Sequence, residues 1–304
     1  MYARYTARMW LVYILLSVFG FAGSNVLDSV SVQHYEKHPV VLMWAQSFFG
    51  ILVLCMLGLF IHVSYFSWAP AFICFGGLVY VGDLLYFRVL DRTDVSVSNI
   101  AWVFLSVLLA VLGIFGLHEE WSLWQGVGIL LVLLGVTYLS LAHQYVTASV
   151  VLLLVAIAIF YVPYYLYQKV ILLHGYDVLT VTFWGMFGRE CMAFLSPWFI
   201  PRFRHAVQSL PRRVDGTFFF LCALIIIFYM FGVYFGILAY QQGMLSLVSI
   251  ASNAQPFFVM VLAWCLWKFK PARASRELLT AQSVRVKLLS FAVVFAGLAL
   301  LVTS

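Results

Sequence analysis

The sequence predicts an all-α integral membrane protein with ten transmembrane helices. Of its 304 residues, 65% are hydrophobic and only 9% are charged, whereas a soluble domain has roughly 25% charged residues. With so few charges the surface cannot face water throughout, so lipid must cover most of it. Ten apolar runs in the chain approach the roughly 20 residues that a membrane-spanning helix needs. Little chain remains between them for a separate soluble domain.

The ten runs follow one another with mostly short connections. Each is apolar around its whole circumference, as expected of a helix in lipid, rather than along one stripe. The first run follows Arg4 and Arg8 and has some features of a signal peptide, but it continues past Ala22, so we interpret it as a retained helix. The expected helices cover residues 10–29, 39–63, 68–90, 95–117, 123–141, 149–172, 178–199, 216–240, 245–267 and 286–302.

Two of the connections are longer and basic. Residues 201–215 contain four arginines, and residues 268–287 contain six basic side chains and a possible interfacial helix near 274–281. The net charge of +6 would suggest a nucleic-acid partner in a soluble protein. In a membrane protein such clusters indicate topology and contact with lipid headgroups. We therefore expect membrane lipid and a small-molecule substrate as partners, and no nucleic acid.

The end of the chain contains a weaker copy of its middle. When Ser96 is aligned with Ser246, Trp102 faces Ser252, and further on Gly135 faces Gly297. The fourth and fifth helices therefore resemble the ninth and tenth, which predicts two five-helix repeats, residues 1–146 and 147–304. An odd number of helices per repeat inverts the second repeat in the membrane, an architecture that is common among secondary transporters.

The segment LGIFGLHEEWSLWQGVGILLVLLGV resembles the signature L-G-E-x-x-x-x-x-x-G-x-x-L-x-x-x-G-V of the ten-helix EamA-type proteins in the drug/metabolite transporter (DMT) superfamily. Glu119 or Glu120 takes the acidic position, and Gly128 and Gly135 take the glycines. In the second half, SLVSIASNAQPFFVMVLA resembles the penultimate helix of the family, with its proline at Pro256. The second half departs from the pattern because it lacks the acidic hairpin.

This resemblance implies metabolite transport, for example export, through a central cavity between helices one, three, four, six, eight and nine. It also implies termini in the cytoplasm, whereas the positive-inside rule puts them outside, because Lys37, Arg88, Arg92 and both basic connections lie on the other side. We expect a multi-pass protein of a plasma membrane, of the bacterial inner-membrane type, acting as a monomer or homodimer. No cofactor is expected.

Polar residues on the fourth and ninth helices are the first candidates for substrate contact. Ser98, Asn99 and Trp102 on one helix, and Ser252 and Asn253 on the other, belong to faces with helical spacing. Pro256 frees a backbone carbonyl near Ser252 and predicts a bend. Small hydroxyl residues also mediate helix packing in lipid, which is the alternative interpretation.

The sixth helix adds a row of tyrosines around Pro163. Tyr161 and Tyr164 are candidates for an aromatic wall that stacks on a flat or cationic substrate, with the interfacial aromatic belt as an equal alternative. For Tyr167 the sequence favours the belt. Glu119 and Glu120, beside two tryptophans, are expected to anchor the hairpin at the interface.

The remaining charges within the helices have a structural and a functional interpretation. Asp28 and Asp83 are expected near helix ends, where interfacial or structural roles are favoured. Arg189 and Glu190 fall in the middle of their helix and point about 100° apart, so one partner should not serve both. They either pair with neighbouring helices or, with Asp83, supply a coupling or binding charge.

No motif of an enzyme accompanies these residues. The sequence contains no phosphate loop, nucleophile triad, metal-ligand cluster, nucleotide fingerprint or HExxH segment, and its five cysteines all lie in apolar runs. We therefore expect no enzyme, no catalytic residue and no metal. The leading hypothesis is a secondary transporter of a small polar or amphipathic metabolite of the amino acid or amine type, with proton coupling as an option. An exchanger of anionic metabolites using Arg189, and a lipid flippase or headgroup-handling protein, are the alternatives.

Overall fold

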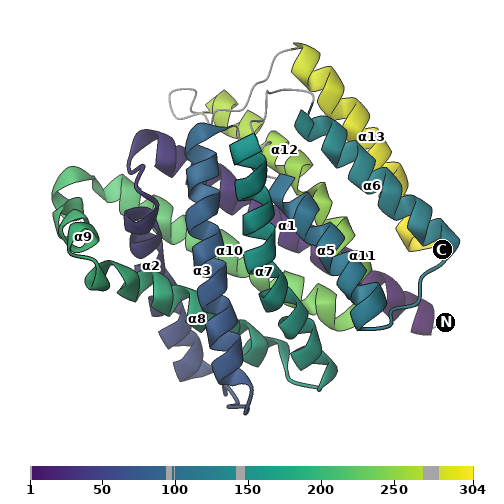
Figure 1. Ribbon diagram of the computed structural model, residues 1–304, viewed down its shortest axis with the longest axis horizontal. Coiled ribbons are helices and arrows are strands. Elements are labelled where there is room, and N and C mark those ends of the chain that lie inside the picture. The colour runs from purple at the N-terminus through teal and green to yellow at the C-terminus, as the bar shows by residue number, and fades with distance from the viewer. Residues whose placement is uncertain (1, 94–97, 99, 142–147, 270–280, 304) are drawn as a thin grey trace.

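The computed structural model describes residues 2–93, 98, 100–141, 148–269 and 281–303, and all regular structure in these segments is helical (Figure 1). The helices are α1 (Tyr2–His34), α2 (Pro39–Phe60), α3 (Ala69–Arg92), α5 (Ile100–Gly116), α6 (Leu123–Leu141), α7 (Ala148–Leu173), α8 (Val178–Phe199), α9 (Pro201–Arg213), α10 (Gly216–Gln242), α11 (Leu245–Ala251), the short 3₁₀ helix η1 (Ser252–Ala254), α12 (Gln255–Phe269) and α13 (Ala281–Thr303).

Each of the ten predicted apolar runs contains a helix. In the described residues, six helical segments are long and apolar enough to cross a membrane: Met9–His34, Pro39–Phe60, Ala69–Arg92, Ala148–Leu173, Gly216–Gln242 and Leu245–Lys268. The apolar parts of α5, α6 and α13 are shorter, at Ala101–Gly116, Leu123–Tyr138 and Leu288–Leu301. The chain is therefore an integral, multi-pass membrane protein.

The basic connection after Ile200 differs from the prediction, because it is the helix α9. A proline opens this helix, where its missing N–H costs nothing. Val207 and Leu210 are buried, whereas Arg212 and Arg213 are exposed, so one apolar stripe holds the helix against the bundle. Arg213 also forms an ion pair of 3.1 Å with Glu36. The interfacial helix predicted near 274–281 lies almost entirely outside the described residues.

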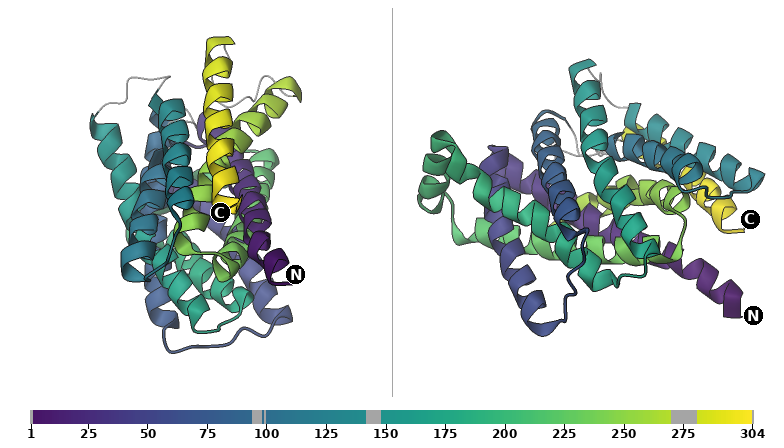
Figure 2. Two further views of the ribbon diagram at one scale, coloured as in Figure 1. Left: turned by 90° about the vertical axis from the view of Figure 1, so that its right-hand side faces the viewer. Right: turned by 60° about the horizontal axis from the view of Figure 1, so that its bottom comes forward.

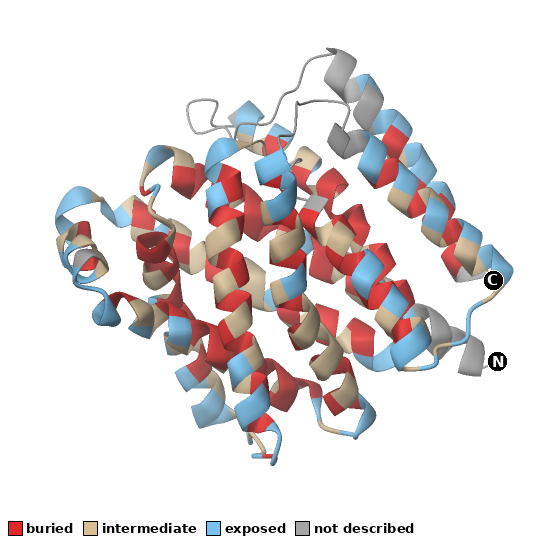
Figure 3. Ribbon diagram, viewed as in Figure 1, coloured by how far each residue is buried: buried red, intermediate tan, exposed pale blue. Residues whose placement is uncertain are grey.

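Buried positions concentrate on the helices in the middle of the bundle, and exposed positions on α9 and on the outer faces of α6 and α13 (Figure 3). The main helix pairs are α1 with α10, α3 with α7 and α8, α2 with α8, α5 with α7 and α11, and α6 with α13. Both chain ends lie on the same side of the bundle (Figure 2). The start of α1 projects out of the bundle on that side.

Glycines permit the closest of these approaches. A Cβ atom at Gly20 of α1 would lie 2.6 Å from the backbone nitrogen of Gly232 on α10, and the Ser17 hydroxyl donates a 2.7 Å hydrogen bond to the Gly232 carbonyl. Gly128 and Gly297 likewise permit close approach of α6 and α13, since each lies against the carbonyl oxygen of the other. Small residues at crossings let backbones pack directly in lipid, as the Gly232-x-x-x-Gly236 motif predicts.

Two charged side chains from other parts of the chain cap the corner between α10 and α11. The Glu119 carboxylate accepts hydrogen bonds from the backbone N–H of Leu245, the N–H of Ser246 at 2.9 Å and the Ser246 hydroxyl at 2.6 Å. The buried Lys169 ammonium donates to the carbonyl oxygens of Tyr240 and Gly243, both at 2.7 Å. The negative Glu119 carboxylate thus lies at the N-terminal, positive end of the α11 helix dipole. The positive Lys169 ammonium lies at the C-terminal, negative end of the α10 dipole.

The prediction that Glu119 is an interfacial anchor was therefore wrong. Its carboxylate satisfies backbone donors that would otherwise have no partner at the start of α11. Glu120, the next residue, is exposed and makes none of these contacts.

We expect Glu119→Gln to destabilise the protein by about 2 kcal/mol, because the amide loses charge-assisted hydrogen bonds to backbone donors. Thermal unfolding of the purified protein in detergent measures this loss. Glu120→Gln is the matched control and should leave the unfolding midpoint unchanged. Equal midpoints for the two variants would contradict the capping role.

Candidate functional site

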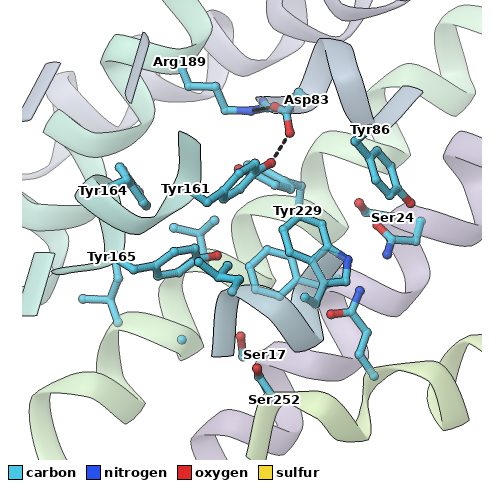
Figure 4. A pocket seen from close by; sticks show the side chains of 18 of the residues that line it. Ser17, Ser24, Asp83, Tyr86, Tyr161, Tyr164, Tyr165, Arg189, Tyr229 and Ser252 are labelled. Carbon is cyan, nitrogen blue, oxygen red and sulfur yellow. Dashed lines mark hydrogen bonds and ion pairs between the residues drawn. The ribbon is translucent and has the colours of Figure 1, made fainter. Parts of the chain in front are cut away.

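A central cavity lies among α1, α3, α5, α7, α10 and the α11–η1–α12 segment, which are the six helices that the family resemblance implies, and side chains of α2 and α8 line it as well. It contains about 1090 Å³ of atom-free space including its mouth. Asp83 and Arg189 lie at one end and Ser17 and Ser252 at the other (Figure 4). Its polar lining residues are Ser17, Ser24, Asn25, Asp28, Gln46, Asp83, Ser106, Gln168, Arg189, Ser249, Ser252 and Gln255.

Arg189 is the centre of a buried charge network at one end of the cavity. Its Nε atom forms an ion pair of 2.6 Å with Asp83 Oδ2 on α3, and its Nη1 atom pairs with Glu190 Oε1. The Tyr161 hydroxyl donates to the other oxygen of Asp83 (Figure 4). The guanidinium also lies 4.2 Å from the centre of the Tyr229 ring. One cation therefore links α3, α7, α8 and α10.

This network corrects two expectations. Asp83 does not reach the interface, because it is 5% exposed and paired inside the bundle. Arg189 and Glu190 also pair with each other, since the long guanidinium arm spans the angle between neighbouring positions on the helix. Asp83 and Arg189 line the cavity, whereas the fully buried Glu190 lies behind Arg189 and does not.

Asp28 on α1 is a second buried carboxylate that lines the cavity. It is 6% exposed, so of the interfacial and structural roles expected for it, burial speaks against the interfacial one. Its Oδ1 atom accepts a 2.7 Å hydrogen bond from Gln46 Nε2 on α2. In the part of the chain that the structure describes, no cation pairs with Asp28.

The polar residues predicted on the fourth and ninth helices divide into two groups. Trp102 and Ser252 line the cavity, but the buried Ser98 and Asn253 do not. Asn253 instead donates a 2.6 Å hydrogen bond to Ser106 on α5 and so ties the two helices together. Asn99 lies outside the described residues.

At the position where Pro256 predicts a bend, the structure has the 3₁₀ turn η1, directly before α12. The Gln255 N–H bonds back to the Ser252 carbonyl in this turn. A 3₁₀ turn has fewer residues per turn than an α-helix and changes the direction of the side chains that follow it. Ser252 lines the cavity, while the neighbouring Asn253 bonds to α5.

The tyrosines of α7 form part of the wall. Tyr161, Tyr164 and Tyr165 line the cavity, as Figure 4 shows. Tyr167 does not, and instead its ring lies 5.0 Å from that of Phe75 and 6.2 Å from that of Trp68. For Tyr161 and Tyr164 the cavity interpretation thus replaces the interfacial belt.

Several lining residues were not predicted from the sequence as cavity residues. Ser17, Ser24 and Asp28 repeat at helical spacing on one face of α1, and Tyr229, Gly236 and Tyr240 do so on α10. This periodicity of polar and aromatic residues within apolar helices is the signal that finds them. Gln46 belongs here as well, since its amide positions Asp28.

The fold and this cavity define a membrane protein with a polar and aromatic binding site at its centre. Residues 8–141, somewhat less than half of the chain, match the EamA-like transporter family, a family of the drug/metabolite transporter superfamily. A transporter role fits that match. Among the solved structures that resemble the chain is one described as "Crystal structure of protein", with 14% sequence identity, a TM-score of 0.69 and 96% of each chain covered; this shows a shared fold. No curated protein matches the sequence.

We expect Arg189→Gln to destabilise the protein by about 3 kcal/mol or more, because it leaves two buried carboxylates without their cation. Thermal unfolding in detergent measures the effect. Arg213→Gln is the control, since its ion pair with Glu36 involves an arginine side chain that is 47% exposed and should contribute little. A double variant, Arg189→Gln with Asp83→Asn, should recover part of the loss, and a further loss in it would contradict the pairing.

Proposed function

We propose that the protein is a secondary transporter that moves a small polar or amphipathic metabolite, of the amino acid or amine type, by alternating access. The observation that carries this proposal is the cavity, which is lined by helices from both ends of the chain and combines aromatic rings with buried polar groups. Such a lining binds a molecule with both apolar and polar parts. We propose Trp102, Tyr161, Tyr164 and Ser252 as direct substrate contacts.

We propose further that ten helices form two inverted repeats, 1–146 and 147–304. In this assignment α1 corresponds to α7, α2 to α8, α3 to α10, α5 to the α11–α12 segment and α6 to α13. Replacing each helix by its counterpart then converts several of the main helix contacts into other observed contacts or into themselves. The α1–α10 contact then corresponds to α7–α3, and the α5–α7 contact to α11–α12 with α1, whereas α2–α8, α5–α11 and α6–α13 correspond to themselves. This pattern supports an internal twofold relation, with the cavity between the repeats.

Proton coupling is part of the proposal, with Asp83 and Glu190 as candidates. The two carboxylates share the Arg189 guanidinium. A proton that neutralises one of them leaves the arginine paired with the other, so no lone charge remains in the apolar interior. Exchange of an anionic metabolite has less support, because Arg189 is already committed to two carboxylates.

Accessibility of the cavity from both membrane faces tests the proposal. In a chain whose five cysteines are replaced by serine, Ser252→Cys should react with a membrane-impermeant thiol reagent from either face, because alternating access opens the cavity to each side in turn. Labelling in right-side-out and inside-out vesicles measures this. Gln208→Cys on the exposed face of α9 is the control and should react from one face only.

Reaction of Ser252→Cys from a single face under all conditions would contradict alternating access. The control variant also reports which face carries α9, and so decides between the two opposed orientations given by the charge bias and by the family resemblance.

A further inference from the structure

We propose that Asp28 binds a positively charged group of the substrate, so that the transported molecule is an amine or another organic cation. This inference rests on the proposed transport function and names the substrate class of the same cavity. The site consists of the Asp28 carboxylate, held by Gln46, and the aromatic side chains that line the same cavity.

The charge balance of the cavity is the first argument. Three charged side chains line it, Asp28, Asp83 and Arg189. Arg189 is shared by Asp83 and Glu190 and stacks on Tyr229. In the described interior, this leaves Asp28 with an amide hydrogen bond and no ion pair, and the nearby charge of Arg189 is already bonded to two other carboxylates.

Lys169, the other buried cation in the described residues, is committed elsewhere. Both of its described hydrogen bonds go to backbone carbonyls at the corner between α10 and α11. A carboxylate at membrane depth without a cation is costly, and such residues usually mark a ligand or ion site. A cationic ligand removes that cost when it binds.

The aromatic lining is the second argument. Four aromatic side chains line the cavity: Tyr86, Trp102, Tyr161 and Tyr165. Figure 4 shows Tyr86 beside Ser24, and Ser24 precedes Asp28 by one turn of α1. Aromatic faces attract organic cations, and tryptophan does so most strongly. A carboxylate in an aromatic enclosure is the chemistry that recognises an ammonium group.

Trp102 adds a directional feature. Its indole Nε1 atom is buried and has no hydrogen-bond partner among the described residues. This donor can bind a hydroxyl or carbonyl oxygen on the substrate. The cavity thus fits a cation that also carries a hydrogen-bond acceptor, whereas an anion would meet the unpaired carboxylate of Asp28.

Three probes of matched shape test the inference: phenethylamine, 2-phenylethanol and 3-phenylpropionate, which are cationic, neutral and anionic at pH 7. Their affinities for the purified full-length protein in detergent are measured by isothermal titration calorimetry. We expect phenethylamine to bind at least tenfold more tightly than the other two, and its affinity to fall at least tenfold in Asp28→Asn.

Asp91→Asn is the matched control, because it removes an exposed carboxylate of α3 and should leave the affinity unchanged. Asp28→Glu keeps the charge and should retain more affinity than Asp28→Asn, which guards against a loss of folding. Failure of phenethylamine to bind, equal binding of the neutral or anionic probe, or wild-type affinity in a folded Asp28→Asn variant would each overturn the inference.

Failure here is distinguishable from failure of the proposed function. The labelling of Ser252→Cys from two faces does not depend on the charge of any ligand. Two-sided labelling without cation binding leaves a transporter of another substrate class, whereas one-sided labelling contradicts transport whichever probe binds.

Discussion

The need to neutralise one guanidinium in an apolar interior determines the centre of the molecule. Arg189 is 4% exposed, and a charge at that depth persists only with partners. It obtains them from Asp83 on α3 and from Glu190 beside it, and its flat face lies against Tyr229 on α10. Asp83 in turn orients the Tyr161 hydroxyl on α7. The packing of four helices and one wall of the cavity therefore depend on a single side chain.

The same constraint acts on the backbone where helices end inside the bundle. Between α10 and α11 the chain turns, and Gly243 and Leu245 at this turn are buried. Glu119, from the α5–α6 hairpin, accepts from backbone N–H groups there, and Lys169, from α7, donates to backbone carbonyls. Both partners come from distant parts of the sequence, so this corner forms only when the whole bundle is assembled.

The sequence predicts those features that depend on local composition and spacing. Apolar length predicts a helix in each of ten runs, Pro256 predicts a bend at the position of η1, and the spacing of Trp102, Tyr161, Tyr164 and Ser252 predicts cavity residues. It does not predict which charges meet. The burial of Asp28 and the cap formed by Glu119 arise from packing between distant helices, which no local pattern encodes. Asn253 does not line the cavity and bonds instead to Ser106 on α5, a contact between distant helices that no local pattern encodes.

The kinds of contact around the cavity also indicate where movement is easiest. Glycines bring α1 against the backbone of α10, and Gly76 and Gly188 bring α3 against that of α8, so the backbones of each pair are close-packed at these positions. Across the cavity, by contrast, α1 meets α2 through the Gln46–Asp28 hydrogen bond, and α8 meets α10 through Arg189 and Tyr229. Close-packed backbones resist separation because interiors are dense, whereas polar side-chain contacts can exchange partners. The rocking of two bundles that alternating access requires would therefore separate α1 and α10 from α3 and α8. A cation at Asp28 would lie on the boundary between them.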